Sequence, residues 1–270
     1  MSVAKSSLKS FLNLISGAFS LRFLIALTNQ KLFLPFYHTV SDNPPPHIKH
    51  LYPVRSITQF IDDLNLLQKH YEFIGIDKFI EISKNKKPNK KYCFLTFDDG
   101  LIEFYNVAAP ILKERNIPAH VFLNSGFVKN QALMFRYKVS LIIDSLRSVD
   151  VDNETLTTIL EILNINSNSK NDISLILLEL RYEDTNILDQ IAKLLNIDFD
   201  EYLKEYQPYM TEKQIDELLQ DGFTFGAHSI DHPEYRFITL EEQINQTSES
   251  VNYIKKIYGF ECFASGLKVK

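Results

Sequence analysis

Thr96-Phe97-Asp98-Asp99-Gly100 closes an apolar run that begins four residues earlier and has the length of a buried strand. Neighbouring side chains of a strand point to opposite faces, so both carboxylates can serve one site only where the strand ends. The glycine gives the backbone the freedom to turn there. Two carboxylates so close repel each other, and a bound dication would neutralise one and leave the other available as a base. The stretch therefore predicts a strand end with a metal site.

Further apolar runs and helix signals alternate along the chain. The runs that predict strands are residues 32–37, 92–97, 120–123, 223–227 and 260–264. Capping boxes between them predict helices that begin after Ser56, Thr211 and Thr239. Strands that alternate with helices pair in parallel, which predicts an α/β layer or barrel. In such folds the chemistry collects at the carboxyl ends of the strands.

The second motif, His228-Ser229-Ile230-Asp231-His232, follows the run at 223–227 and so marks another strand end. Its spacing places the two imidazoles either on one helical face or together around a turn. Two imidazoles and one carboxylate are normal ligands of catalytic zinc and leave one position for water. The aspartate between the histidines could orient an imidazole or simply form the turn. His-x-x-x-His alone is a weak signal; its pairing with Asp-Asp-Gly on another strand end predicts the metal site.

Together the two motifs resemble the first two motifs of the polysaccharide deacetylases, the NodB-homology group also called carbohydrate esterase family 4. The resemblance implies a distorted (β/α) barrel and the metal-dependent hydrolysis of acetyl groups, usually N-acetyl, from an acetylated oligo- or polysaccharide. It implies that Asp98 is the catalytic base that deprotonates a metal-activated water. It also implies that Asp99, His228 and His232 hold a divalent metal ion, with Zn²⁺ as the favoured ion.

The chain between the two motifs lacks the strand–helix alternation. We predict a NodB-like domain at residues 32–127 and 209–270, interrupted by an all-helical insertion at 128–208. The helices expected in the insertion cover residues 140–146, 156–163, 173–180 and 187–195, with a polar loop at 164–172. The insertion could cap the active site as a lid or dock a partner. The lid is preferred because insertions fall in loops at the face where the site lies.

The family's third motif has no full counterpart in this chain. It carries an Arg or an aromatic residue and a Pro near a strand end, where this chain has Cys262-Phe263-Ala264-Ser265-Gly266. The later motifs, which supply a wall of the acetyl pocket and the general-acid histidine, are not found before residue 270. We therefore expect a C-terminally incomplete barrel with an open edge. An alternative function follows: a truncated, non-catalytic remnant that binds metal and sugar without turnover.

Composition limits the classes of function. Hydrophobic residues at 45% and charged residues at 23% describe an ordinary folded protein rather than a disordered chain. The net charge of −5 argues against nucleic acid as a partner. Cys93 and Cys262 both lie in apolar runs without the spacing of a metal or redox motif, so buried reduced thiols are expected.

Residues 1–31 have apolar side chains at helical spacing, which predicts an amphipathic helical segment. Arg22 interrupts the apolar run, which is too short to span a bilayer. The segment also lacks the small-x-small cleavage site that a signal peptide would carry. We expect a cytoplasmic protein, with weak contact to a membrane surface through Lys5, Lys9 and Arg22 as the alternative. A third hypothesis makes this segment and the insertion docking parts of a polysaccharide assembly pathway.

Other histidines are expected to have structural roles. His120 is interpreted as a packing residue beside a strand. His47 and His50 flank three consecutive prolines, where solvent exposure is expected. His38, at the end of the first predicted strand, could line the cleft or serve a structural role.

Overall fold

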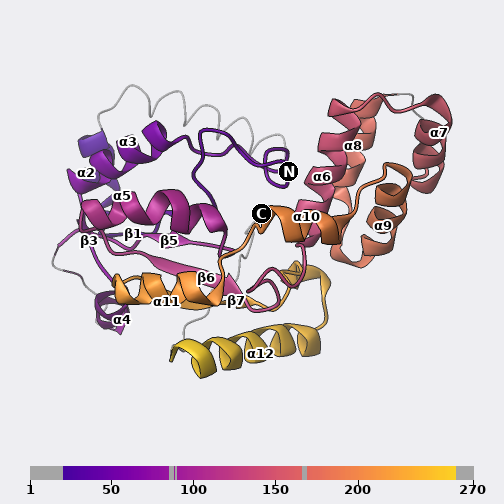
Figure 1. Ribbon diagram of the computed structural model, residues 1–270. Helices are drawn as coiled ribbons and strands as arrows, with labels where there is room; N and C mark the ends of the chain where they lie inside the picture. The colour runs from indigo at the N-terminus through magenta and orange to yellow at the C-terminus, as the bar shows by residue number, and fades with distance from the viewer. Residues whose placement is uncertain (1–20, 85–87, 89, 166–168, 260–270) are drawn as a thin grey trace.

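The computed structural model describes residues 21–84, 88, 90–165 and 169–259 of the 270-residue chain (Figure 1). The amphipathic segment is therefore described only from α2 (Leu21–Thr28) onward. The membrane-contact hypothesis rests largely on residues 1–20, and the predicted strand at 260–264 with Cys262 follows residue 259, so both lie outside these ranges. Within them, every helix is too short or too polar to cross a lipid bilayer.

Short parallel strands form two sheets in the described residues. The first sheet has the order β1 (Leu32–Phe33), β4 (Tyr92–Cys93), β3 (Glu72–Phe73). The second has the order β2 (Phe36–Tyr37), β5 (Thr96–Phe97), β6 (His120–Asn124), β7 (Thr224–Ser229). The α/β class with parallel pairing is confirmed. In the part of the chain that the structure describes, β2 and β7 are edges of the second sheet, and a closed barrel is not seen.

Two predicted strands are each divided in two. The predicted strand at 32–37 consists of β1 and β2, and the predicted strand at 92–97 consists of β4 and β5. Pro35, between β1 and β2, has no N–H to donate to a ladder. The break lets one chain segment pair in both sheets, Leu32 with Tyr92 and Phe36 with Thr96. The two-residue strand β3 was not predicted at all.

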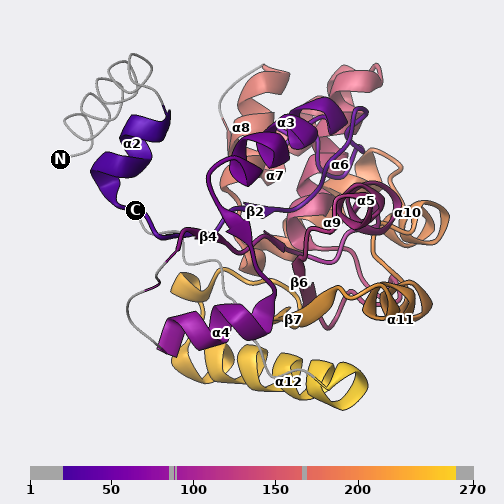
Figure 2. The ribbon, with the colours of Figure 1, turned by 90° about the vertical axis from the view of Figure 1, so that its left-hand side faces the viewer.

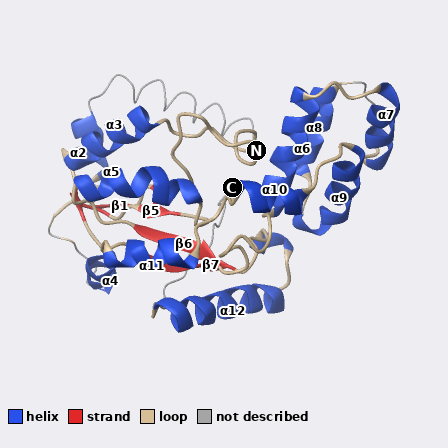
Figure 3. Cartoon of the chain, in the orientation of Figure 1, coloured by secondary structure: helices blue, strands red, loops and turns tan. Residues whose placement is uncertain are grey.

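Helices cover the strands on opposite sides (Figures 1 and 3). They are α3 (Ile57–Gln68), α4 (Ile76–Lys84), α5 (Ala109–Glu114), α11 (Glu212–Gln220) and α12 (Leu240–Tyr258). The predicted capping boxes at Ser56, Thr211 and Thr239 are all confirmed, each hydroxyl accepting from the N–H three residues on. Figures 1 and 2 show α3 and α12 on opposite sides of the strands.

The main hydrophobic core lies between the strands and these helices. Phe97, the last residue of β5, is fully buried at its centre, with its ring 4.7 Å from that of Phe104 and 5.5 Å from that of Tyr37. Burying a side chain of this size stabilises the fold by about 1.5–3 kcal/mol. The residue directly before the Asp98-Asp99 pair is therefore firmly anchored.

Between β6 and β7 the chain forms a group of helices, here called the helical segment. Its members are α6 (Phe135–Ser148), α7 (Asn153–Ile162), α8 (Lys170–Glu179), α9 (Thr185–Leu194) and α10 (Phe199–Tyr206). Its own hydrophobic cluster is centred on Ile142, Leu177 and Ile191. The four predicted helices are present, whereas α10 was missed and residues 170–172, predicted as loop, begin α8. The division into a domain and an insertion stays a prediction.

Candidate metal centre

The first strand end turns more sharply than the sequence indicated. Asp98 N–H donates to the Tyr37 carbonyl at 2.8 Å and so continues the β2–β5 ladder. Asp99 and Gly100 then both adopt left-handed backbone, with φ of 70° and 66°. Only the glycine was expected to turn, and a left-handed aspartate costs about 1–2 kcal/mol. The tight turn places two successive carboxylates at the same end of the strand.

The second strand end is displaced from the predicted one. The predicted strand stopped at residue 227, but β7 continues to Ser229, which pairs with Asn124 after a register shift in β6. His228 therefore lies within the strand. Beyond it the backbone turns, with φ of 129° at Ser229 and 62° at His232. Of the two arrangements left open by the spacing, the structure has the turn.

Hydrogen bonds to Ser229 fix the shape of this turn. The Ser229 hydroxyl accepts from the Asn124 amide at 2.9 Å and from the His232 N–H at 3.0 Å. The Ser229 carbonyl accepts from the Ser250 hydroxyl of α12 at 2.8 Å and from the Ser125 N–H at 3.0 Å. Because Asn124, Ser229 and Ser250 are buried, these bonds hold the turn that carries the two histidines in place.

Gln246 of α12 supports the same turn from the other side. Its carbonyl oxygen accepts from the Ile230 N–H at 2.9 Å, and its amide donates to Asp231 Oδ1 at 2.6 Å. Asp231 Oδ2 accepts from the Tyr182 hydroxyl, which follows α8 in the chain. Its carboxylate is thus hydrogen-bonded to Gln246 and Tyr182, which identifies it as a structural residue of the turn.

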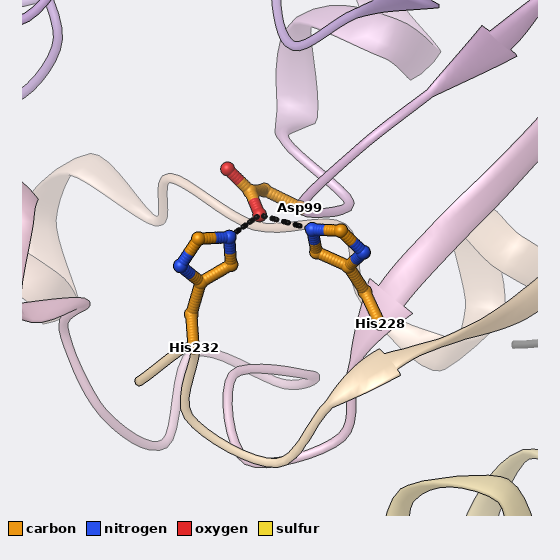
Figure 4. A group of neighbouring side chains, drawn as sticks. All are labelled: Asp99, His228 and His232. Atoms are coloured by element: carbon orange, nitrogen blue, oxygen red, sulfur yellow. Dashed lines mark ion pairs between the residues drawn. The ribbon is translucent and has the colours of Figure 1, made fainter. Parts of the chain in front are cut away.

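The predicted ligands from the two strand ends lie together (Figure 4). The Nε2 atoms of His228 and His232 lie 3.8 Å and 3.6 Å from Asp99 Oδ1. Asp99 and His228 are only 3% and 4% exposed. Asp99 Oδ1 is buried and accepts no hydrogen bond from the described residues. A buried carboxylate oxygen that two imidazoles face, and that lacks a donor, fits a divalent cation.

The surroundings of the two aspartates shift their pKa values in opposite directions. Burial alone would raise the pKa of Asp99, but the imidazoles of His232, His38 and His228 lower it overall, which favours the ionised carboxylate. Burial raises the pKa of Asp98 to about 6, with a further contribution from the charge of Asp99. Burial also lowers the pKa of His232 and favours the neutral imidazole that binds metals.

Two further residues contact Asp99. His38, after β2, has its Nε2 atom 3.9 Å from Asp99 Oδ2, so it belongs to the site rather than serving only the fold. The Tyr137 hydroxyl of α6 donates to the same oxygen at 3.1 Å. No sequence pattern indicated Tyr137, because it lies in the helical segment, outside both motifs. A cavity of about 400 Å³ opens beside His38. Its lining includes Phe36, Tyr52 and Arg55.

The prediction that His47 and His50 are exposed is wrong. His47 is fully buried, and its Nδ1 atom lies 2.8 Å from the Tyr202 hydroxyl of α10. His50 is partly buried, with Nε2 3.0 Å from Asp144 Oδ1 of α6. The helical segment covers the proline loop, which its composition alone could not show. The packing role of His120 is confirmed, since it is buried with Nδ1 2.7 Å from the Thr224 hydroxyl.

Comparison with protein families then identifies the lineage. A family model described as polysaccharide deacetylase matches residues 85–262. The chain belongs to the polysaccharide deacetylase family. The matched range contains both strand ends of the candidate metal centre, and it also contains the helical segment, which the sequence resemblance had left outside. No curated protein sequence gives a match to the chain.

Solved deacetylase structures share this fold at low sequence identity. The Streptococcus pyogenes deacetylase PplD, solved in complex with acetate, is 18% identical with a TM-score of 0.53, covering 87% of this chain and 72% of that chain. IcaB from Ammonifex degensii is 16% identical with a TM-score of 0.52, covering 89% and 76%. These likenesses confirm the NodB-type fold class.

Proposed function

We propose that this chain is a metal-dependent hydrolase that removes acetyl groups, N-acetyl in particular, from an acetylated oligo- or polysaccharide. The observation that carries the proposal is the buried Asp99 oxygen that two imidazoles face, with a second carboxylate beside it. Membership of the polysaccharide deacetylase family supports the substrate class. Enzymes of this family are generally metal-dependent, which agrees with the donor set.

The proposed ligands are Asp99 Oδ1 and the Nε2 atoms of His228 and His232. Each residue offers one ligand atom, and these atoms all lie within 4.8 Å of one another. Two imidazoles with one carboxylate favour Zn²⁺ among the common divalent ions and leave room for water. When bound, such an ion lowers the pKa of water and polarises the acetyl carbonyl.

Asp98 is proposed as the general base. Its side chain is half-buried, whereas Asp99 is almost fully buried, so Asp98 is the carboxylate of the pair with access to substrate. Burial raises its pKa to about 6, which suits a group that takes a proton near neutral pH. The proton removed from the attacking water would reside on this carboxylate.

A second candidate is a protein that binds metal and sugar without turnover. It is favoured by the departure from the family's third motif at Ser265, a residue that lies outside the described ranges. Activity distinguishes the two candidates. Both require the same metal ligands, but only the hydrolase requires Asp98 as a general base.

Acetate release from an acetylated chito-oligosaccharide tests the proposed function. The purified chain should release acetate, lose that activity on chelation and regain it with Zn²⁺, and Asp98→Asn should lower its rate by about 10²–10⁴-fold. Asp62→Asn provides the control, because Asp62 is an exposed aspartate of α3, a helix outside both motifs. A chain that binds Zn²⁺ and releases no acetate would support the non-catalytic candidate.

A further inference from the structure

Adjacent residues of α6 contact both strand ends that carry the proposed ligands. The Tyr137 hydroxyl donates to Asp99 Oδ2 at 3.1 Å, after β5. Arg136 Nη2 lies 2.6 Å from Glu234 Oε1, two residues beyond His232. Figure 1 shows the helical segment beyond the carboxyl ends of β6 and β7, where these contacts form. One helix thus joins two parts of the site that the chain order keeps far apart.

We propose that α6 positions the carboxylate of Asp99 for metal binding, with Tyr137 as the positioning residue and the Arg136–Glu234 ion pair as its anchor. This inference rests on the proposed function only for the identity of the metal ligands. It gives the helical segment a role as a fixed support of the metal centre.

The two oxygens of Asp99 have different surroundings. Oδ2 accepts the Tyr137 hydroxyl, whereas Oδ1 accepts no hydrogen bond from the described residues and lies nearest the two imidazoles. A hydroxyl bound to one oxygen fixes the rotation of the carboxylate and leaves the other free to bind a cation. Tyr137 is only 1% exposed, so water does not compete for this bond. Asp99 is thereby prepared to bind the ion through Oδ1.

A layer of aromatic rings holds Tyr137 in place. Its ring lies 6.0 Å from that of Tyr209 in a stacked arrangement and 5.1 Å from that of His47. The Tyr209 hydroxyl accepts from the Met134 N–H at 3.0 Å, directly before α6 begins. The Asn130 side chain bonds both the N–H and the carbonyl of Tyr209 at 2.9 Å. The tyrosine is therefore rigidly placed relative to the strand ends.

The anchor at Arg136 is itself held on both sides. Its Nη1 atom donates to the Leu178 carbonyl of α8 at 3.0 Å, while Nη2 pairs with Glu234. Glu234 also pairs with Arg236 at 2.6 Å. Since the Arg136 and Glu234 side chains are about one-quarter exposed, this pair is shielded from bulk solvent in part. It ties the turn that ends at His232 to the same helix that carries Tyr137.

Titration calorimetry of Zn²⁺ into the metal-free chain at one fixed pH tests the inference. Tyr137→Phe retains the ring, and Tyr258→Phe is the matched control, because it removes another buried tyrosine hydroxyl, one that bonds neither Asp99 nor α6 among the described residues. We expect Tyr137→Phe to weaken Zn²⁺ binding by about 10-fold, the effect of losing an outer partner of a ligand, and Tyr258→Phe by less than about twofold. The visible spectrum of the Co²⁺-loaded chain should change in Tyr137→Phe alone.

Two results would overturn the inference: unchanged Zn²⁺ affinity in Tyr137→Phe, or equal losses in the two variants. If Tyr137→Phe does not fold, Glu234→Gln is tested instead. Lys138→Gln is then the control, because Lys138 pairs with Asp189 inside the helical segment and not with a strand end. Glu234→Gln should then weaken binding and Lys138→Gln should not, and equal affinities would reject the role of α6. A wild-type chain that binds no Zn²⁺ would instead reject the metal site of the proposed function.

Discussion

The Nε2 atom of His232 lies 3.6 Å from Asp99 Oδ1, across the gap between the ends of β7 and β5. These strands are not neighbours, because β6 lies between them in the sheet. His228, the last residue but one of β7, approaches the same oxygen at 3.8 Å. An ion bound here would join two strand ends that are not hydrogen-bonded to each other in the sheet, so we expect metal binding and stability to be linked.

Zn²⁺ should stabilise the chain against unfolding. At a free concentration 100 times the dissociation constant, binding to the folded state alone adds about 2.7 kcal/mol to the free energy of unfolding. Thermal unfolding with Zn²⁺ and with chelator measures this difference. The double variant His228→Ala, His232→Ala should lose it, while His70→Ala, in the turn between α3 and the amino end of β3, should keep it. An undiminished Zn²⁺ effect in the double variant would place the ion elsewhere.

Replacing each of the two adjacent aspartates by asparagine should change a different property: the rate of acetate release for Asp98 and the Zn²⁺ affinity for Asp99. Asp98→Asn should lower the rate of acetate release by about 10²–10⁴-fold, the usual contribution of a general base, and leave Zn²⁺ affinity unchanged. Asp99→Asn should weaken Zn²⁺ binding, because the amide carries no negative charge. Calorimetry and rate measurements on both variants check this. A loss of Zn²⁺ affinity in Asp98→Asn equal to that in Asp99→Asn would contradict the assigned roles.

Gln246 should matter for both stability and metal binding. Gln246→Ala removes two part-buried hydrogen bonds, to the Ile230 N–H and to Asp231, and each such bond contributes about 0.5–1.5 kcal/mol to stability. Urea unfolding of the metal-free chain measures the cost, and Zn²⁺ affinity should fall because the turn loosens. Asn245→Ala, at an exposed position of the same helix, is the control. Equal stability of the two variants would show that the hydrogen bonds of Gln246 do not stabilise the turn.

Two buried histidines should make the metal-free chain less stable in acid. Burial lowers the pKa of His47 to about 3 and that of His120 to about 4, from 6.5 for an ordinary histidine. The unfolded chain therefore binds protons that the folded chain does not, and stability falls as the pH drops below 6.5. The contribution of each histidine approaches about 1.4 kcal/mol per pH unit once the pH is about one unit below that value and still above the pKa of the folded group.

The variant His120→Gln isolates one of these contributions, because glutamine can still bond the Thr224 hydroxyl. Urea unfolding of the metal-free wild type and variant should give different slopes of stability between pH 6 and about pH 5, with the variant less sensitive. Above pH 7 the two slopes should agree. Parallel slopes throughout would mean that His120 titrates in the folded chain as it does in the unfolded one.

Features set by local contacts could be predicted from the sequence. The capping boxes at Ser56, Thr211 and Thr239 depend only on bonds across three residues, and all three form. The first strand end could be located at Phe97 and the second only approximately, because an apolar run followed by polar residues is a local pattern. The meeting of Asp99 with both histidines follows from parallel pairing, which brings carboxyl ends of strands to one edge.

Features set by distant contacts could not be predicted. The bond between Tyr137 and Asp99 joins residues that no periodic pattern relates. The burial of His47 depends on α10, which was itself missed. The extension of β7 to Ser229 requires Asn124 as a partner across a register shift. In each case the deciding neighbour lies in another element, whose position only the fold determines.

An anomalous difference map at the zinc absorption edge, from a crystal of this chain grown with Zn²⁺, tests the metal centre most directly. We expect a single strong peak within bonding distance of Asp99 Oδ1 and of the Nε2 atoms of His228 and His232, about 2.0–2.2 Å from each. A map without a peak there, or with its main peak on other residues, would contradict the proposal that the ends of β5 and β7 form a metal site.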